Sequence, residues 1–417
     1  MLAGLIAVQL AVAGVAVARH DPPAPPPRRP VSARPAVVVL EREQAVRALL
    51  AQRSEAVRRH DRTAFLATVE PGPFATRQAQ LYDALAQLPF AQWDYELVAA
   101  SSQPASRALD VRRGQWWSPE TTLVYALRGF DEAPVRRREQ LTFVERQGRW
   151  LVAADDDFPA VATGRDLWDD GPTLVIRTLS CLIAGHPRRA TLVRSLAAQC
   201  DAAIPRVSAV WGDGWARQVV LLVPDDAREL TRLVPEAGDL SQIAAVASAE
   251  ITGSRPSADR VLVDPAVFER LGPLGRRIVL THEVTHVASR AATGSQLPTW
   301  MSEGLADYVG YLGTGVPVEV AASELQVAVR AGRLPTHLPD DAAFDGSRKD
   351  LAQSYESSWL AVRVLVDRYG QAGMLAFYRA VGSDTRPGAV GRALAAVGSS
   401  TTAFTADWRA DLRRRLG

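Results

Sequence analysis

The chain has 417 residues, of which 47% are hydrophobic and 23% are charged. This composition is that of a globular protein and excludes disorder throughout, while the length favours two globular domains over one. The formal net charge is only +2 at pH 7, and the basic residues are spread along the chain. Such a charge gives no electrostatic footprint for DNA or RNA, so we expect no nucleic-acid partner. All basic residues except Lys349 are arginine, a bias typical of a GC-rich bacterial genome.

The N-terminal segment 1–18 carries no charged side chain, and seven prolines follow between Pro22 and Pro35. As a helix, this segment would be about 27 Å long, just short of the hydrocarbon core of a bilayer. It predicts either a cleaved signal peptide, with Ala16–Ala18 at the cleavage site, or a retained membrane anchor. The proline-rich segment 19–36 predicts a stiff, extended linker. We therefore expect an extracytoplasmic protein, secreted or anchored, which contacts the membrane only through segment 1–18 if that segment stays uncleaved.

Cys181 and Cys200 are the only cysteines, and they fall at the edges of an expected strand and an expected helix. In an exported protein they can form a disulfide, whose loop is worth ~3 kcal/mol in the chain-entropy model. Two buried thiols are the alternative. Their spacing does not fit a zinc site of the Cys-x-x-Cys kind.

Residues 37–165 predict helices followed by antiparallel strands. Apolar spacing and period-two alternation place helices over 41–60, around Phe65 and over 75–88, then strands around Trp93, Leu123, Phe143 and Val152, with a hairpin turn at Gln147–Gly148. This order resembles the cone-shaped nuclear-transport-factor-two-like fold, whose members include enzymes with a buried Asp and His and proteins that only bind. The region's one histidine, His60, falls at a helix end, so we expect an accessory domain. The three aspartates 155–157 are expected at an exposed strand end rather than in a cation site.

Residues 166–417 predict a second domain, so the fold class expected for the chain is α+β. Strands are expected over 173–178, 219–223 and 260–263, with a helix over 189–203 between the first two. The sequence after Thr299 predicts helices only, and Gly370 is expected to end a helix that begins at Ser354. An α+β lobe is thus followed by a mostly helical lobe.

The most informative motif is His282-Glu283-x-x-His286, within a helix expected over 271–291. Helical positions four apart share a face, so both imidazoles can bind one metal ion. Glu283 is turned about 100° away and can reach a water molecule on the metal rather than the metal itself. Packing in the core is the alternative for a single histidine, but a pair at this spacing indicates a metal site.

A catalytic zinc needs a third protein ligand. The chain lacks the glycine and the third histidine that the metzincins place after this motif; instead, Trp-x-x-Glu-Gly-x-Ala begins at Trp300 on a new expected helix. The two motifs together resemble the gluzincin, or peptidase MA-like, metallopeptidases. The resemblance implies Zn²⁺ bound by His282, His286 and Glu303. Gly304 is expected where the two metal-site helices cross closely, because a side chain has little room there.

By the same resemblance, two further residues join the site. Asp307 lies one turn beyond Glu303, where a carboxylate can accept a hydrogen bond from the far nitrogen of a ligand histidine. A surface acid is the alternative for Asp307. The family supplies a tyrosine or histidine from its helical lobe to stabilise the oxyanion. Tyr355 is the first candidate for that role, ahead of His337 and Tyr308, and ordinary packing is its alternative.

The strand expected over 260–263 precedes the metal-site helix. The resemblance implies that it is the edge strand along which an extended peptide lies by β-augmentation. The Gly-x-Met-Glu-Asn element with which aminopeptidases of this type hold a free amino terminus does not occur in the chain. An endopeptidase is therefore expected rather than an aminopeptidase.

These residues imply a zinc-dependent peptidase that hydrolyses a peptide or protein substrate outside the cytoplasm. Glu283 takes a proton from the water that the metal activates and passes it to the leaving amine. Two alternatives stay open: a catalytically silent zinc-containing module that binds a peptide or protein, and a zinc hydrolase that acts on other substrates. The presence of all four residues of the basic chemistry counts against the silent module.

Overall fold

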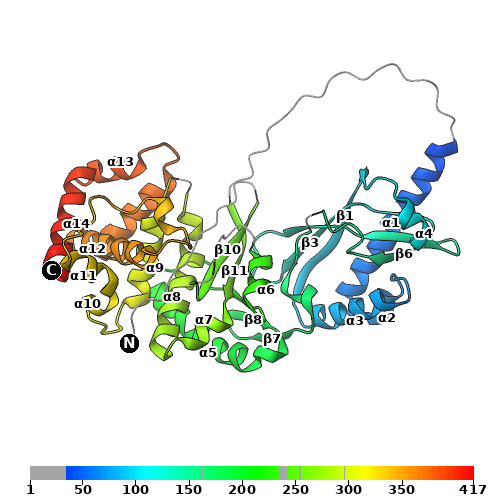
Figure 1. Cartoon of the computed structure of the whole chain (residues 1–417), viewed down its shortest axis with the longest axis horizontal. Helices are drawn as coiled ribbons and strands as arrows, with labels where there is room; N and C mark the ends of the chain where they lie inside the picture. Colours follow the sequence, from blue (N-terminus) through cyan, green and yellow to red (C-terminus); the bar gives the residue numbers. More distant parts are fainter. Residues whose placement is uncertain (1–33, 162, 235–239, 241, 253–254, 295) are drawn as a thin grey trace, which may run out of the picture. The chain divides into compact units, whose positions relative to one another are not determined.

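The computed structural model describes residues 34–161, 163–234, 240, 242–252, 255–294 and 296–417, in two compact units (Figure 1). The N-terminal unit ends at Thr173, and the main part of the C-terminal unit begins at Leu174. The expected signal or anchor segment 1–18 and most of the expected linker lie outside the described residues. Among the helices that are described, none is long and apolar enough to cross a membrane.

The N-terminal unit combines helices with two three-stranded antiparallel sheets. One sheet has the strand order β1-β3-β4 and the other has the order β2-β5-β6. The helices are α1 (Arg34–Arg58), α2 (Arg62–Leu66), α3 (Pro73–Leu85) and α4 (Arg107–Arg113), with a short 3-10 helix at Leu167–Asp170. The strands are β1 (Phe90–Ser102), β2 (Trp116–Trp117), β3 (Pro119–Leu127), β4 (Val135–Glu139), β5 (Thr142–Arg146) and β6 (Arg149–Ala154).

The hairpin turn expected at Gln147–Gly148 is confirmed between β5 and β6. Both residues have positive φ, 55° and 78°, which a two-residue turn matching the twist of its strands requires. Strand β4 is not predicted by apolar alternation, because its sequence Val-Arg-Arg-Arg-Glu buries only Val135 and exposes two arginines. The apolar alternation that predicts a strand around Leu123 belongs to its partner strand β3.

The core of the N-terminal unit forms where α1 packs against β1 and β6. The apolar residues whose spacing predicts this helix, Val46, Leu49, Leu50 and Val57, are all buried. The buried cluster comprises side chains from α1, α3, the strands and the loops that connect them: Val46, Leu49, Leu50, Val69, Phe74, Leu97, Trp117, Leu141, Phe143 and Val152.

The C-terminal unit contains one five-stranded sheet with the order β10-β11-β9-β8-β7. The three inner strands are parallel, and the two outer strands are antiparallel to their neighbours. Because parallel neighbours need a crossover connection, helix α5 links β8 to β9. The elements are β7 (Leu174–Arg177), β8 (Cys181–Gly185), α5 (Ala190–Trp211), β9 (Val219–Val223), α6 (Ala227–Leu233), β10 (Ala245–Thr252) and β11 (Arg255–Val263), with a 3-10 helix at Pro187–Arg189.

The strand expected over 260–263 is the last part of β11, and its expected place in the sheet is wrong. Strand β11 lies between β9 and β10, so both of its edges are paired. The edge strand on this side is β10, whose sequence Ala-Val-Ala-Ser-Ala-Glu-Ile-Thr is rich in small residues with weak strand preference. The physical reason for the error is that β10 gives no strand signal of its own.

Cys181 and Cys200 form a disulfide, the first of the two alternatives weighed from the sequence. Cys181 is the first residue of β8, and Cys200 lies on α5. Both side chains are fully buried. The bond therefore ties the crossover helix to the sheet that it covers.

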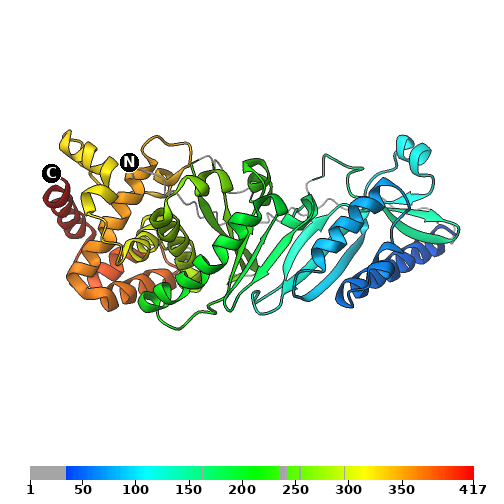
Figure 2. The same ribbon diagram turned by 90° about the horizontal axis from the view of Figure 1, so that it is seen from below.

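Helices make up the rest of the C-terminal unit, beside its sheet (Figure 2). They are α7 (Pro265–Arg270), α8 (Pro273–Ser289), α9 (Thr299–Tyr311), α10 (Val318–Ala321), α11 (Ser323–Arg330), α12 (Leu351–Ser383), α13 (Ala389–Ala396) and α14 (Thr401–Leu416), with 3-10 helices at Arg290–Ala292 and Asp341–Phe344. Gly370 breaks α12 at the expected position, with φ 70° and ψ 168°. A second helical half follows the break directly, up to Ser383, so Gly370 makes a kink rather than an end.

Candidate metal centre

Helices α8 and α9 carry the predicted metal-binding residues. A proline marks the start of each helix: Pro273 is the first residue of α8, and Pro298 directly precedes α9. Helix α9 has no capping side chain of its own at its first residue. Asp341 supplies the cap instead, because its Oδ1 accepts hydrogen bonds from the backbone N–H and the hydroxyl of Thr299, at 3.0 and 2.7 Å. This contact fixes the first turn of α9, which directly precedes Glu303.

Glycine residues let α9 approach both of its neighbouring helices. A Cβ atom at Gly304 would lie 2.4 Å from the carbonyl oxygen of Ser358 on α12, and one at Gly310 would lie 3.1 Å from that of Ile278 on α8. The close approach expected at Gly304 is therefore real, but its expected partner is wrong. Gly304 faces α12, and the contact with the helix of the first motif occurs at Gly310, almost two turns later.

His282, His286 and Glu303 converge in the core, and each is at most 1% exposed. Nε2 of His282 lies 3.0 Å from Nε2 of His286 and 3.2 Å from Oε2 of Glu303. The third side of this triangle, from His286 Nε2 to the same carboxylate oxygen, is 3.3 Å. Donors about 2.1 Å from a tetrahedral zinc lie roughly 3.4 Å from one another, so the three atoms fit this ion.

The charge state of these three residues also favours a bound cation. Oε1 of Glu303 is buried and makes no hydrogen bond within the described residues. Against the effect of burial, the two neighbouring imidazoles lower the pKa of Glu303, so its carboxylate stays ionised. A buried, ionised carboxylate facing two imidazole nitrogens is stabilised by a metal ion.

Asp307 lies where the sequence predicts it. Its Oδ1 is 2.8 Å from Nδ1 of His282, and it is only 4% exposed. It is therefore not a surface acid. Because a carboxylate accepts the proton on Nδ1, the contact leaves Nε2 of His282 with a lone pair toward the donor triangle.

Glu283 stays outside the donor triangle, as its helical position predicts. Both of its carboxylate oxygens are buried, and neither makes a hydrogen bond of good geometry with the described residues. Burial raises the pKa of Glu283 to about 8, while the charge of His282 and the backbone N–H of Ala247 on β10 act to lower it. A cation bound in the triangle would lower the pKa of Glu283 from this raised value, because a nearby positive charge stabilises the ionised carboxylate. Glu283 therefore has free acceptor atoms beside both the donor triangle and the edge strand.

For two of the three candidates for the oxyanion role, the polar group contacts a partner away from the donor triangle. His337 is exposed, and its Nδ1 contacts the backbone oxygen of Leu338. The Tyr308 hydroxyl donates to Gln371. Tyr355 is 2% exposed, and its ring meets that of Phe344 edge-on.

The turn of α12 that carries Tyr355 is held by the next residue. Both carboxylate oxygens of Glu356 accept backbone N–H groups at the start of α11, from Glu324 at 3.3 Å and from Leu325 at 2.6 Å. The position of Tyr355 is thus fixed by its neighbour, and its role stays a prediction.

Three residues near the metal centre are not predicted from the sequence: Asp341, Ser302 and Tyr378. Ser302 lies within the second motif, and its Oγ is 3.4 Å from Nδ1 of His286. Tyr378, on the second half of α12, has its hydroxyl 3.0 Å from that of Thr293, in the segment after α8. Serine and tyrosine are common residues, so no local pattern marks these roles.

A second group of possible donors consists of His186, Asp225 and Glu229. Here Nε2 of His186 is 2.7 Å from Oε1 of Glu229, which is hydrogen-bond distance. The guanidinium of Arg188 pairs with the Asp225 carboxylate, and that of Arg189 binds the Asp225 backbone oxygen. Arginine side chains therefore already supply positive charge to this group. We interpret it as a cluster that stabilises the end of the sheet rather than as a metal site.

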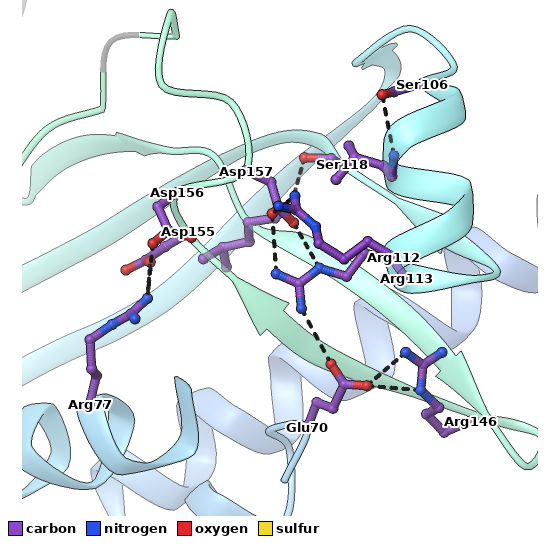
Figure 3. A network of polar contacts seen from close by, with 12 residues as sticks. Glu70, Arg77, Ser106, Arg112, Arg113, Ser118, Arg146, Asp155, Asp156 and Asp157 are labelled. Atoms are coloured by element: carbon purple, nitrogen blue, oxygen red, sulfur yellow. Dashed lines mark hydrogen bonds and ion pairs between the residues drawn. The ribbon is translucent and has the colours of Figure 1, made fainter. Parts of the chain in front are cut away.

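The aspartates 155–157 of the N-terminal unit form ion pairs with arginines (Figure 3). The Asp157 side chain is 3% exposed and pairs with both Arg112 and Arg113. The other two aspartates pair with Arg77, at 3.1 and 3.3 Å. The expectation of an exposed strand end is wrong for Asp157, because two guanidinium groups stabilise its buried charge.

Comparisons with known proteins give only remote likeness. No protein-family profile matches the chain, and no curated protein is similar to it in sequence. The chain is similar to a solved M1 zinc metallopeptidase from Deinococcus radiodurans, with 15% identity and a TM-score of 0.31 over 66% of this chain. A mutant M1 zinc metallopeptidase from the same organism, bound to a Tyr-Ser-Ala substrate, gives 16% identity and a TM-score of 0.30 over 66% of this chain. The matches span 58% of each solved chain, and such remote likeness establishes neither fold nor activity.

Proposed function

We propose that this chain is a zinc-dependent peptidase, with an endopeptidase as the expected type. The observation that carries the proposal is the buried triangle of His282, His286 and Glu303, with Glu283 beside it, whose carboxylate makes no hydrogen bond of good geometry with the described residues. Three protein donors leave the fourth tetrahedral position open, which distinguishes a catalytic zinc site from a structural one.

Each residue then has a defined task. Bound in the triangle, Zn²⁺ would lower the pKa of a water molecule towards ~7 and polarise the scissile carbonyl. Glu283 takes a proton from that water and delivers it to the leaving amine. Asp307 holds the ring of His282 in one tautomer. The hydroxyl of Tyr355 donates to the oxyanion of the tetrahedral intermediate.

The substrate proposed is an extended peptide or protein segment. Strand β10 is the outer strand of the sheet and packs against α8, the helix of the first motif. An edge strand offers backbone N–H and C=O groups to an added strand. We therefore transfer the peptide-binding role from β11 to β10.

The proposed location is outside the cytoplasm. The Cys181–Cys200 disulfide supports it, because such bonds persist in oxidising compartments and are rare in the cytosol. The N-terminal unit is proposed as an accessory domain, and segment 1–18 as the signal peptide or anchor.

The test is digestion of an unstructured protein by the purified chain, with and without chelation of zinc, followed by mass spectrometry of the products. Internal cleavage that stops on chelation and returns with Zn²⁺ is expected. Stepwise loss of single N-terminal residues would replace the endopeptidase by an aminopeptidase. Bound zinc without cleavage of any peptide would favour the binding module.

A further inference from the structure

Strand β10, which lies beside β11, is not accessible along its whole length (Figure 1). Its first three residues, Ala245, Val246 and Ala247, are each only 1% exposed, and α8 packs against the strand. Ser248 and Ala249, which follow, are partly exposed. A peptide can pair only with backbone groups that it reaches, so pairing with β10 is expected beyond Ala247.

The register of β10 on β11 determines which of its backbone groups point to the outer edge. The pairing is continuous over residues 245–250 and shifts after them. Just before β10, the carbonyl oxygen of Ala244 accepts the N–H of Asp264, at 3.0 Å, so Ala244 faces β11. In an antiparallel pair, the backbone groups of successive residues alternate between the partner strand and the opposite side. Ala247 and Ala249 therefore both turn their N–H and C=O groups away from β11.

The side chain of Arg290 occupies the first of these two positions. Arg290 follows the last residue of α8, four residues beyond His286, and is 8% exposed. Its Nη2 donates to the carbonyl oxygen of Ala247, at 3.1 Å. Its Nε donates to Oδ1 of Asp259 on β11, at 2.8 Å. Asp259 lies opposite Ala249 in the register, so one guanidinium group is bonded to both strands.

Ala249 is the position that this arrangement leaves open. Its outward backbone groups have no hydrogen-bond partner among the described residues. It is also the last outward position before the register shift that follows Glu250. The ion pair of Arg290 with Asp259 is largely buried, with side chains 9% and 22% exposed, so the guanidinium is firmly placed. The edge of β10 is thus closed at Ala247 and open two residues later.

We propose that Arg290 is a positioning residue for the substrate, because it closes β10 at Ala247 and makes an extended peptide pair its backbone with Ala249. The place of this pairing then decides which bond of the peptide reaches the metal centre. One residue of the peptide must offer a backbone N–H to Ala249, so proline is excluded at that position. The proposal rests on the peptide-binding role of β10 in the proposed function, but not on cleavage.

The test uses tetra-alanine peptides that carry a zinc-binding hydroxamate at either the amino or the carboxyl end, with one backbone nitrogen methylated at a time. The hydroxamate fixes the peptide on the metal, and each methyl group removes one backbone donor. Binding to the zinc-loaded full chain is measured by calorimetry. In the parent, methylation at one position should weaken binding by about 5-fold or more, the weight of one hydrogen bond. Methylation two residues away, opposite Ala247, should have no effect.

Two variants of Arg290 should change this pattern. Arg290→Ala frees the carbonyl oxygen of Ala247, so the position two residues away should become sensitive to methylation by a similar factor. Arg290→Lys keeps the charge beside Asp259 but has one nitrogen in place of two, so it should open the edge in the same way even if the alanine variant does not fold. Arg276→Ala is the matched control. It removes another arginine of α8 that binds a backbone oxygen, that of Glu269 at 2.7 Å, and should keep the parent pattern.

The pattern separates positioning from general loosening of the fold, because loosening weakens all peptides alike and creates no new sensitive position. Uniform weakening, or an unchanged pattern in the zinc-loaded Arg290 variants, would overturn the proposal. A parent in which no single position is sensitive would overturn it as well. The expected pattern in a parent that cleaves no peptide would overturn only the peptidase. A parent that binds none of the hydroxamate peptides would overturn both proposals.

Discussion

The two units each contain a cluster of acidic side chains, and the clusters differ in what faces them. In the N-terminal unit, Glu70 and the aspartates 155–157 all pair with guanidinium groups (Figure 3). In the C-terminal unit, both carboxylate oxygens of Glu283 and Oε1 of Glu303 lie in the core without a hydrogen bond of good geometry to the described residues. Arginines neutralise the first cluster, and the second is the one that the proposed zinc ion would complete.

This difference shows that a run of charges does not by itself identify a functional site. Burying an ionised group without a partner is expensive, so a fold keeps one only where something else compensates it. Three successive aspartates stand out in the sequence, yet arginines from other elements pair with all of them. The less conspicuous Glu303 is the carboxylate that arginine does not reach.

The largest expected effect is on zinc binding by Glu303→Ala. Removal of one of three protein donors should reduce bound zinc from one ion per chain to little or none, a greater loss than the ~10–100-fold typical of residues behind the ligands. Metal analysis of the purified protein measures it. Glu319→Ala, which removes an exposed glutamate of α10, is the control and should keep one zinc. Full zinc content in Glu303→Ala would remove this residue from the ligands.

A smaller effect is expected for Tyr355→Phe. If its hydroxyl donates to the oxyanion, peptide hydrolysis should fall by about 10-fold or more while zinc content stays unchanged. Tyr308→Phe is the matched control, since its hydroxyl is engaged with Gln371. Parent-like kcat/KM in Tyr355→Phe would assign this tyrosine to packing against Phe344.

The smallest effect is expected in the N-terminal unit, for Asp157→Asn. This change leaves two arginines without their buried partner, and because both guanidinium groups are partly exposed, the cost should be about 1–2 kcal/mol in the free energy of unfolding of this unit. Asp156→Asn, whose side chain is 61% exposed, should cost less than about 0.5 kcal/mol. Hydrogen exchange of the β-strands in urea measures both. A loss of zinc in Asp157→Asn would contradict the assignment of this cluster to stability.

The sequence predicts that His282, His286 and Glu303 come together because its information here is local. The spacing of His282 and His286 fixes a shared helix face, and Glu303 and Asp307 follow on one further helix, one turn apart. The break at Gly370 and the turn at Gln147–Gly148 are predicted for the same reason. Each depends on residues that are neighbours in the chain.

What the sequence does not predict depends on tertiary contacts. The partner helix of Gly304 and the edge position of β10 follow from how elements distant in the chain pack together. Tyr378 contacts Thr293 only because the kinked second half of α12 returns to the end of α8. Such contacts leave no periodic signal, so their residues are found only in the structure.

The central claim is that Glu283 acts on water and not on the metal, and Glu283→Gln tests it most directly. The change keeps size and helix preference but removes the base. One zinc per chain should remain, while hydrolysis of an unstructured protein at neutral pH should fall by about 10²-fold or more. Zinc content and cleavage are measured on the same preparation, beside the parent. Parent-like cleavage by a fully zinc-loaded Glu283→Gln protein would contradict the mechanism.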